Sequence, residues 1–222
     1  MTFQKTATRA RAILVFFVVI GCQSIAAQQV KTSPLIPKVQ PGEEIVVIET
    51  KYGKVKIQLF PDVAPKHVEN FKKLINEGFY NGVAFHRAVS NLIMQGGDPN
   101  TKGKDRSTWG MGDESLPKVK AEFNDRPFVK GTLGAARGGD PNSASTQFFI
   151  CVSAYPDWNG QYTNFGQVIS GIRTVQTMTL APTDEQQRLT EKIVMTKVYL
   201  EKYQKPIKRP SNTKRRKPKQ NL

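Results

Sequence analysis

Three polar side chains stand inside short apolar segments near the middle of the chain. They are Arg87, Gln95 and Gln147. An arginine or glutamine in a strand is usually solvated at an edge, but three of them in separate apolar segments weaken that interpretation. Arginine keeps its proton and presents a rigid fork of donors, so it could stabilise an electron pair that develops during a reaction.

The strand period of two gives each polar residue an apolar neighbour on its own face. The pairs expected to share a face are Phe85 with Arg87, Ile93 with Gln95, and Gln147 with Phe149. The sequence therefore predicts polar side chains beside an apolar wall.

Several other chemistries lack the residues that they need. The glycines before Lys104 are spaced one residue too far apart for a phosphate loop, and Asp105 stands where that loop needs Ser or Thr. The two histidines, His67 and His86, stand apart in the sequence, so no metal cluster is visible. No Ser or Cys lies in an activating motif, which argues against covalent hydrolysis. We expect neither a metal nor a cofactor.

The elements that must position these residues belong to a chain of 222 residues and 24.8 kDa, which suits one domain with appended ends. Its net charge of +15 is concentrated at the two ends. Between residues 28 and 200 the chain carries 21 basic and 17 acidic residues, so the central part is nearly balanced. The charge is therefore not evidence that the domain binds nucleic acid.

The first 27 residues resemble a signal peptide. A basic start is followed by an apolar stretch over residues 12–21 and by small residues at which a signal peptidase could cut. The alternative is a lipobox over Val19–Cys22, in which case residues 1–21 are removed and Cys22 carries a lipid. Both alternatives export the protein, and we expect a periplasmic location with no disulfide between Cys22 and Cys151.

The sequence between the signal and the end of the chain divides into three parts. Residues 28–42 are polar and rich in proline, which is typical of a linker. The domain is expected over residues 43–203. Residues 204–222 form a basic tail that we expect to be disordered. The tail is either solvated without a specific partner or attracted to an anionic membrane surface, and export disfavours nucleic acid.

Hydrophobic periodicity predicts many short strands and two helices. A hairpin is expected over residues 43–60, and a helix begins at Pro65 and stops at Gly78. A second short helix follows Gly171. The further strands are expected at residues 83–89, 92–96, 131–135, 146–152, 162–168 and 192–199. This pattern favours a β-barrel capped by helices over alternating βαβ units.

Six motifs in a fixed order resemble a cyclophilin-type peptidyl-prolyl cis-trans isomerase. They are Phe85–Arg87, Met94–Asp98, Ala121–Phe123, Gly131–Leu133, Asn142–Ile150 and Asn164–Gly166. The resemblance implies a mostly β fold, a closed eight-stranded antiparallel β-barrel capped by two α-helices. It also implies that the substrates are proline-containing polypeptides, which the N-terminal segment would place among exported proteins. We expect the chain to be a monomer.

The resemblance assigns roles to residues of this chain. Arg87 and Gln95 would form the catalytic polar pair, with Phe149 gripping the proline ring. The other residues expected to contact substrate are Phe85, His86, Leu92, Ile93, Ala136, Arg137, Gln147, Trp158 and Tyr162. Rotation about a prolyl bond breaks no covalent bond, but it faces a barrier of about 18 to 20 kcal/mol. An arginine at the proline nitrogen would interact most strongly with the twisted transition state.

The chain departs from the family pattern at the site. Leu92 and Ile93 replace the usual Phe and Met, Trp158 is shifted by one position, and Tyr162 stands where many members have His. These changes argue against binding of the cyclic peptide drug after which the family is named. Trp158 is either a plug at the barrel mouth or a substrate contact. The alternatives to an isomerase are a proline-peptide binding chaperone with little turnover, and a scaffold whose tail is the active part.

Overall fold

The computed structural model describes residues 38–103 and 105–205, all within one compact unit. The expected signal peptide, Cys22, residues 28–37 of the linker and residues 206–222 of the basic tail lie outside these ranges. Within them, no helix combines the length and the apolar character that crossing a membrane requires.

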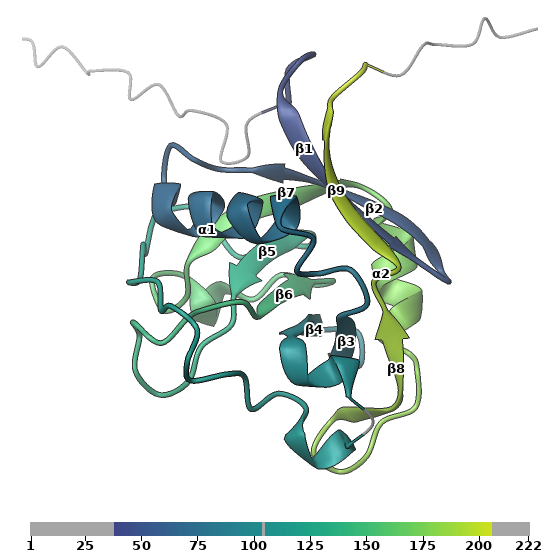
Figure 1. Ribbon diagram of the computed structural model, residues 1–222. Coiled ribbons are helices and arrows are strands. Elements are labelled where there is room, and N and C mark those ends of the chain that lie inside the picture. Colours follow the sequence, from purple (N-terminus) through teal and green to yellow (C-terminus); the bar gives the residue numbers. More distant parts are fainter. Residues whose placement is uncertain (1–37, 104, 206–222) are drawn as a thin grey trace, which may run out of the picture. The chain divides into compact units, whose positions relative to one another are not determined.

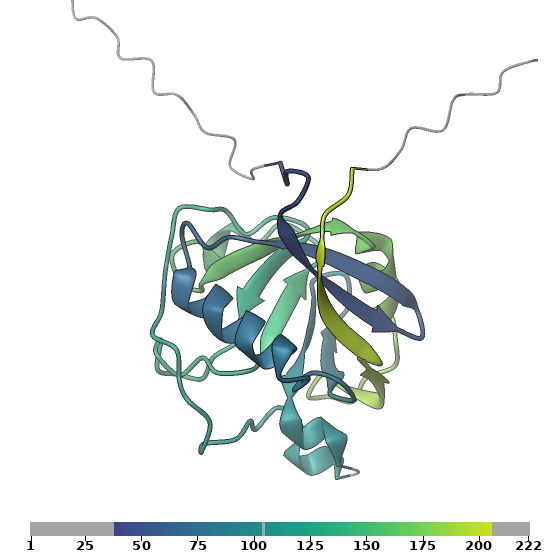
Figure 2. The same ribbon diagram turned by 45° about the horizontal axis from the view of Figure 1, so that its top comes forward.

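Nine antiparallel strands form one sheet, in the order β8-β3-β4-β6-β5-β7-β2-β1-β9 (Figure 1). The strands are β1 Glu44–Thr50, β2 Gly53–Leu59, β3 Ala84–Val89, β4 Ile93–Asp98, β5 Thr132–Ala135, β6 Phe148–Cys151, β7 Asn164–Ser170, β8 Arg188–Val194 and β9 Lys197–Lys202. The helices are α1 Pro65–Asn76 and α2 Ile172–Met178, with short 3-10 turns η1 Pro99–Lys102, η2 Arg106–Thr108 and η3 Pro156–Trp158. The α1 helix packs beside β9 and α2 against β2 (Figures 1 and 2).

The sheet is a curled half-barrel with two edges, so the prediction of a closed eight-stranded barrel is wrong. The single closing strand expected near residues 192–199 is two strands, because this segment changes partner at Met195 and Thr196. The N–H of Met195 still donates to the carbonyl of Val83, but that of Thr196 donates to the carbonyl of Glu49 in β1. The edge strands β8 and β9 follow one another along the chain and do not pair with each other.

The α1 helix begins at Pro65, as predicted, and depends on a distant residue for its cap. Its own N-terminal residue provides no side-chain cap. Instead the carboxylate of Glu122 accepts the N–H groups of Lys66 and His67, each at 3.0 Å, and contacts His67 Nδ1 at 2.7 Å. This negative charge suits the positive end of the helix dipole and ties the loop around Glu122 to α1.

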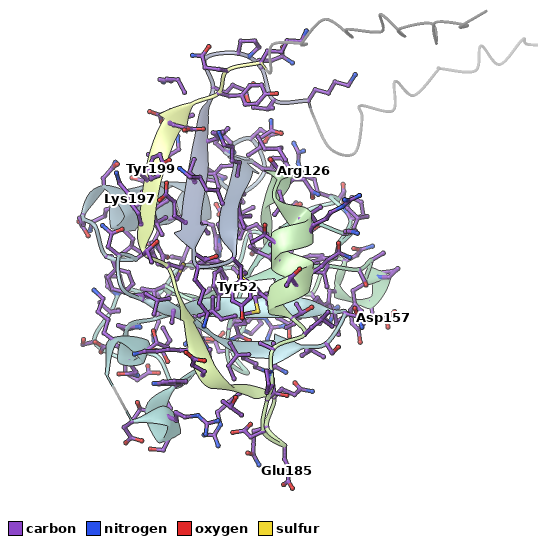
Figure 3. The ribbon with its side chains drawn as sticks, turned by 90° about the vertical axis from the view of Figure 1, so that its right-hand side faces the viewer. Tyr52, Arg126, Asp157, Glu185, Lys197 and Tyr199 are labelled. Atoms are coloured by element: carbon purple, nitrogen blue, oxygen red, sulfur yellow. The ribbon has the colours of Figure 1, made fainter. Side chains whose placement is uncertain are left out.

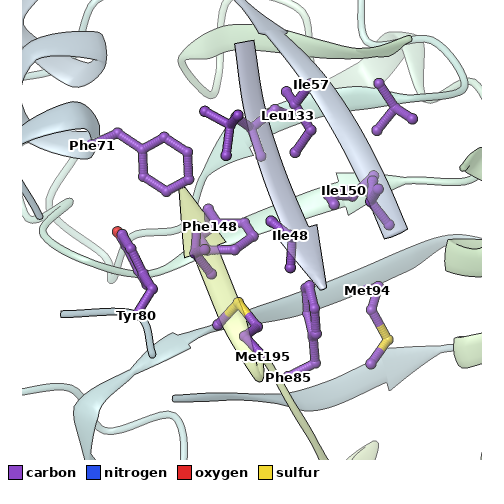
Figure 4. Packing of buried hydrophobic residues seen from close by; sticks show 14 of the residues in the cluster. Ile48, Ile57, Phe71, Tyr80, Phe85, Met94, Leu133, Phe148, Ile150 and Met195 are labelled. Atoms are coloured by element: carbon purple, nitrogen blue, oxygen red, sulfur yellow. The ribbon is translucent and has the colours of Figure 1, made fainter. Parts of the chain in front are cut away.

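The main core lies on one face of the sheet, beneath α1. Phe148 occupies its centre and meets Phe71, Tyr80 and Phe85 edge to face, with ring centroids 5.3 to 5.8 Å apart (Figure 4). All four side chains are at most 3% exposed. The Tyr80 hydroxyl donates to the carbonyl of Thr146 at 2.8 Å, so its burial leaves that hydroxyl paired.

Candidate functional site

A second apolar cluster packs around Phe149, the residue next to Phe148. Its buried members are Ile93, Phe128, Phe149 and Cys151. Partly buried side chains surround them, namely Val89, Leu92, Ala136, Trp158 and Tyr162. Since consecutive residues of a strand point to opposite faces, β6 carries the main core on one side and this cluster on the other. The structure thus brings together the predicted apolar site residues Leu92, Ile93, Ala136, Phe149, Trp158 and Tyr162.

Aromatic rings fix the position of Phe149. Its centroid lies 5.1 Å from that of Trp158 and 5.6 Å from that of Tyr162, both edge to face. On another side it stacks on Phe128 at 6.0 Å and 25°. Trp158 therefore contacts Phe149 despite its shifted place in the sequence.

Phe128 is a member of the cluster that the sequence analysis missed. It is 1% exposed but lies in a loop, where no strand or helix period marks it. Its N–H donates to Asn159 Oδ1 at 2.8 Å, and its carbonyl accepts the N–H of Tyr155 at 2.8 Å. These bonds join Phe128 to the turn that carries Trp158.

The remaining buried member of the cluster, Cys151, has a free thiol. Burial raises the pKa of this thiol to about 12, so it packs as an apolar group.

The polar residues of the site form a directed chain of hydrogen bonds. Arg87 Nη1 donates to Gln95 Oε1 at 3.1 Å, Gln95 Nε2 donates to Gln147 Oε1 at 3.1 Å, and Gln147 Nε2 donates to the carbonyl of Gly110 at 3.1 Å. Because arginine can only donate, each amide must accept with its oxygen and donate with its nitrogen. The chain begins at one guanidinium and fixes the orientation of both glutamines.

The carbonyl of Gly110, the last acceptor in this series of hydrogen bonds, lies in a loop that is itself held in place. Asp98, at the end of β4, is fully buried, and its Oδ2 accepts the N–H groups of Gly110 and Gly112 at 2.5 and 3.2 Å. Its Oδ1 accepts the N–H of Asn100 at 3.0 Å, which caps η1. The loop that receives Gln147 is therefore anchored to the same strand that supplies Gln95.

Arg87 is half-buried and reaches two amide oxygens. Besides Gln95, its Nη2 donates to Gln187 Oε1 at 2.5 Å. Burial lowers the pKa of the guanidinium, and Tyr162 opposes that shift. Arginine nevertheless remains charged in proteins, so Arg87 provides a permanent cation beside the Phe149 cluster.

A β-bulge overturns one of the predicted face assignments. Phe85 pairs with Gly96 and Arg87 with Gln95, so His86 is an extra residue and the period of two is broken. Phe85 points into the main core, away from Arg87, and the prediction that it shares a face with Arg87 is wrong. Ile93 and Gln95 keep their period, because no register shift interrupts β4 where it pairs with β6. Gln147 directly precedes β6 and accepts from Gln95, the register partner of Phe149, so it lies on the Phe149 side as predicted.

His86 also lies behind the site rather than in it. Its ring is 1% exposed, and among the described residues neither ring nitrogen has a hydrogen-bond partner. Burial lowers its pKa to about 4, opposed by the charge of Asp98. Phe85 and His86 are buried too completely to contact a bound substrate as predicted.

Within the described ranges, no group of three or more His, Cys, Asp or Glu side chains could hold a metal ion.

A pocket of about 200 Å³ adjoins the polar chain. Gln95, Gln147 and Ala136 form part of its wall, and the charged residues Asp113, Glu114, Lys118 and Arg137 lie around it. The guanidinium of Arg137 stacks over the ring of Tyr162 at 4.6 Å and donates to the carbonyls of Gly138 and Gln161, each at 2.9 Å. Arg137 thus links this pocket to the Phe149 cluster.

Comparisons with known proteins show which family this chain is similar to. The model of the family "Cyclophilin type peptidyl-prolyl cis-trans isomerase/CLD" matches residues 45–200. A probable peptidyl-prolyl cis-trans isomerase of Brucella suis is 47% identical over 137 residues, covering 60% of this chain and 70% of that protein. A peptidyl-prolyl cis-trans isomerase of Schizosaccharomyces pombe is 36% identical over 152 residues, covering 68% of this chain and 96% of that protein.

A solved structure shows the same fold. The crystal structure of a cyclophilin-type isomerase of Cryptosporidium parvum, determined in the presence of the dipeptide Ala-Pro, superimposes with a TM-score of 0.63 at 30% identity. The match covers 72% of this chain and 99% of that one. Since the family model spans well over half of the sequence, the chain belongs to the cyclophilin-type peptidyl-prolyl cis-trans isomerases.

Proposed function

We propose that this protein accelerates cis-trans rotation about Xaa-Pro bonds in exported polypeptides. The observation that carries the proposal is the guanidinium of Arg87, held by Gln95 beside an apolar cluster centred on Phe149. A prolyl substrate needs both parts, because its ring is apolar and its amide nitrogen is the atom whose bonding changes.

The mechanism follows from the electronic structure of the amide. As the bond twists, resonance is lost and the proline nitrogen regains a lone pair. A donor at that nitrogen binds the twisted state better than the planar one, and only such a difference lowers the barrier. Arg87 would supply this donor while Phe149 grips the ring and the preceding carbonyl rotates.

The reduction in the rotation barrier that catalysis requires is larger than one hydrogen bond from Arg87 can provide. Lowering the time of isomerisation from tens of seconds to milliseconds requires about 5 to 7 kcal/mol. One charged hydrogen bond is typically worth about 1.5 to 3 kcal/mol. The rest would come from orientation of the substrate by the site. The proline ring would lie against Leu92, Ile93, Trp158 and Tyr162. The peptide beside the proline would lie in the adjoining groove, along Ala136, Arg137 and Gln147.

The proposal is tested by NMR exchange spectroscopy on a Xaa-Pro peptide. We expect Arg87→Ala to lower the catalysed exchange rate by about 10- to 150-fold, the equivalent of one charged hydrogen bond. The matched control is Arg173→Ala, an exposed arginine on α2, which should leave the rate unchanged. A near-normal rate in Arg87→Ala would contradict the assigned role of the arginine.

The same experiment addresses the alternative function. A proline-peptide binding chaperone would bind the peptide, visible as shifted resonances, without accelerating exchange. We favour the enzyme because Arg87 and Gln95 are in contact and both lie beside an intact aromatic cluster. Binding by the wild-type chain without exchange would support the chaperone instead.

We further propose that the protein is exported to the periplasm, on the basis of the basic and apolar segments within residues 1–27. A lipid on Cys22, or the basic tail, would then hold it near a membrane. Mass spectrometry of the mature N-terminus distinguishes the two processing routes. Removal of residues 1–27 gives an unmodified chain, whereas removal of residues 1–21 gives a chain that begins with a lipid-modified Cys22.

A further inference from the structure

We propose that Gln187 is a positioning residue that holds the guanidinium of Arg87 in the orientation needed for catalysis. The inference rests on the proposed isomerase activity and adds a residue to it. Arg87 Nη1 donates to Gln95 at 3.1 Å, and Nη2 donates to Gln187 at 2.5 Å. Both terminal nitrogens of the guanidinium are thus engaged, by amide oxygens from β4 and from the turn before β8.

The backbone at Gln187 adopts a conformation that side chains rarely take. Its φ is +64°, in the left-handed region that favours glycine. Such a conformation persists in a residue other than glycine only where the surroundings enforce it, and these sites tend to be functional. Here the N–H of Gln187 donates to the carbonyl of Asp184 at 2.9 Å, and the carbonyl of Gln187 accepts the N–H of Ala88 at 3.0 Å. Ala88 directly follows Arg87, so the turn is bonded to the backbone beside the arginine.

The carboxylate of Asp184 holds this turn together. Its Oδ1 accepts the N–H groups of Gln186 and Arg188, at 3.0 and 2.9 Å. Its Oδ2 accepts Arg188 Nε at 3.1 Å and Arg106 Nη2 at 3.0 Å. Glu185 lies at the tip of the turn and points away from the sheet (Figure 3). The chain therefore presents Gln187, and not its acidic neighbours, to Arg87.

Arg87 lies opposite another positively charged residue in the sheet, and this turn keeps the two charges separately paired. In the β3–β8 ladder the register partner of Arg87 is Arg188, another cation. Asp184 engages the guanidinium of Arg188, which leaves Gln187 as the partner of Arg87.

A neutral acceptor suits the proposed chemistry. A carboxylate in place of the Gln187 amide would pair with the guanidinium and offset the positive charge that must act on the proline nitrogen. An amide oxygen fixes the direction of the donors and leaves that charge available to the substrate. Gln95 is also an amide, so Arg87 is oriented from two sides without being neutralised.

The test compares Gln187→Leu and Gln187→Gly with Gln186→Leu. The first two remove the acceptor, and Gln187→Gly also relieves the backbone at φ +64°. Gln186 is the matched control because its amide accepts from Arg188, not from Arg87. The measurements are the exchange rate at saturating peptide, the Kd of the peptide, the Tm and the NMR signal of the Arg87 guanidinium.

We expect both Gln187 variants to lower the exchange rate by about three- to tenfold, the equivalent of one hydrogen bond, with a smaller change in Kd. The Tm of Gln187→Gly should equal or exceed that of the wild type, so the lower activity would not result from lower stability. Rotation of the Arg87 guanidinium should become faster in both variants. Gln186→Leu should match the wild type in all four measurements.

A third variant, Gln187→Glu, distinguishes the effect of orienting the Arg87 guanidinium from the effect of its positive charge. It retains an acceptor for Arg87 and should keep rotation of the guanidinium slow, yet it should lower the exchange rate because the new carboxylate offsets the charge. Wild-type rates in folded Gln187→Leu and Gln187→Gly would overturn this inference alone. A wild-type chain that binds the peptide without accelerating exchange would instead overturn the proposed function.

Discussion

Phe148 and Phe149 are neighbours on one strand, are almost equally buried at 1% and 4% exposure, and belong to different parts of the molecule. The rings around Phe148 are all buried in the main core. Those around Phe149 include the partly buried Trp158 and Tyr162. The exposure of a side chain therefore does not distinguish a core residue from a site residue, whereas the exposure of its neighbours does.

The two clusters also differ in what lies at their borders. The main core is enclosed by α1 and the sheet, so its contacts serve stability. The Phe149 cluster is bordered by Arg87 and the amides that hold it, so one side of it can meet a substrate with both apolar and polar groups. A single strand thus supplies stability on one face and function on the other.

The largest expected effect is the loss of stability in Phe148→Ala. Removing a buried phenylalanine ring from a closed core should lower the unfolding free energy by about 3 to 5 kcal/mol. Phe149→Ala should cost less stability, because Leu92, Trp158 and Tyr162 at the open border can move inward, but it should nearly abolish isomerase activity. Chemical denaturation and the exchange assay measure the two effects. Equal stability losses in both variants would contradict the distinction between the closed core around Phe148 and the open cluster around Phe149.

The next effect is an acid-dependent loss of stability caused by His86. Burial lowers its pKa from 6.5 to about 4, with Asp98 opposing and Arg87 reinforcing the shift. The unfolded chain therefore binds a proton at a pH where the folded chain does not. The contribution of His86 to stability should be constant above pH 6.5 and should be lost as the pH is lowered towards 4, by about 3 kcal/mol.

Unfolding curves of His86→Leu at several pH values test this expectation. The variant should lose less stability than the wild type over the same pH range. His67 is the other histidine of the chain, and burial lowers its pKa as well, opposed by Glu122, so part of the acid dependence should remain. An identical pH profile in variant and wild type would show that His86 is not responsible.

Local patterns predicted much of the fold and of the site. The first hairpin, the helix from Pro65 and the short helix after Gly171 depend on the period of apolar residues and on proline and glycine signals, which act over a few residues. The resemblance pointed to the apolar residues that gather around Phe149. Alternation correctly placed Ile93 and Gln95 on one face of β4, and Gln147, just before β6, accepts from Gln95 on the Phe149 side.

What could not be predicted depends on partners far away in the sequence. The bulge at His86 shifts the register of β3 against both β4 and β8. The segment around Met195 is divided because its two halves pair with different strands, β3 and β1. Phe128 is buried by the turn at residues 155–162, and Gln187 faces Arg87 through a turn held by Asp184. None of these arrangements leaves a period in the sequence.

A smaller effect is expected where a glycine makes room for Phe149. A Cβ atom at Gly134 would lie 2.3 Å from Cζ of the Phe149 ring, so Gly134→Ala must displace that ring. Such overpacking typically costs about 1 to 3 kcal/mol of stability. The ring would move towards the open border of the cluster, so the Kd for a proline peptide should rise.

The matched control is Gly139→Ala, because a Cβ atom there would meet nothing within 4 Å. This variant should keep the wild-type stability and Kd. Unchanged peptide binding in Gly134→Ala would mean that the cluster tolerates a displaced ring, and the distinction between the closed core and the open cluster would become sharper.

The smallest effect is expected from removing the basic tail. Tyr203 is bonded to the domain in both directions, since its N–H donates to the carbonyl of Glu43 and its own carbonyl accepts the N–H of Gly42. A chain that ends at Lys205 keeps these bonds and should retain the wild-type Tm and exchange rate. The proposed salt-dependent association with anionic vesicles should be lost. A chain that ends at Lys202 lacks them and should unfold at a lower temperature. A lower exchange rate in the chain that ends at Lys205 would instead give the tail a part in catalysis, because neither cluster would have been altered.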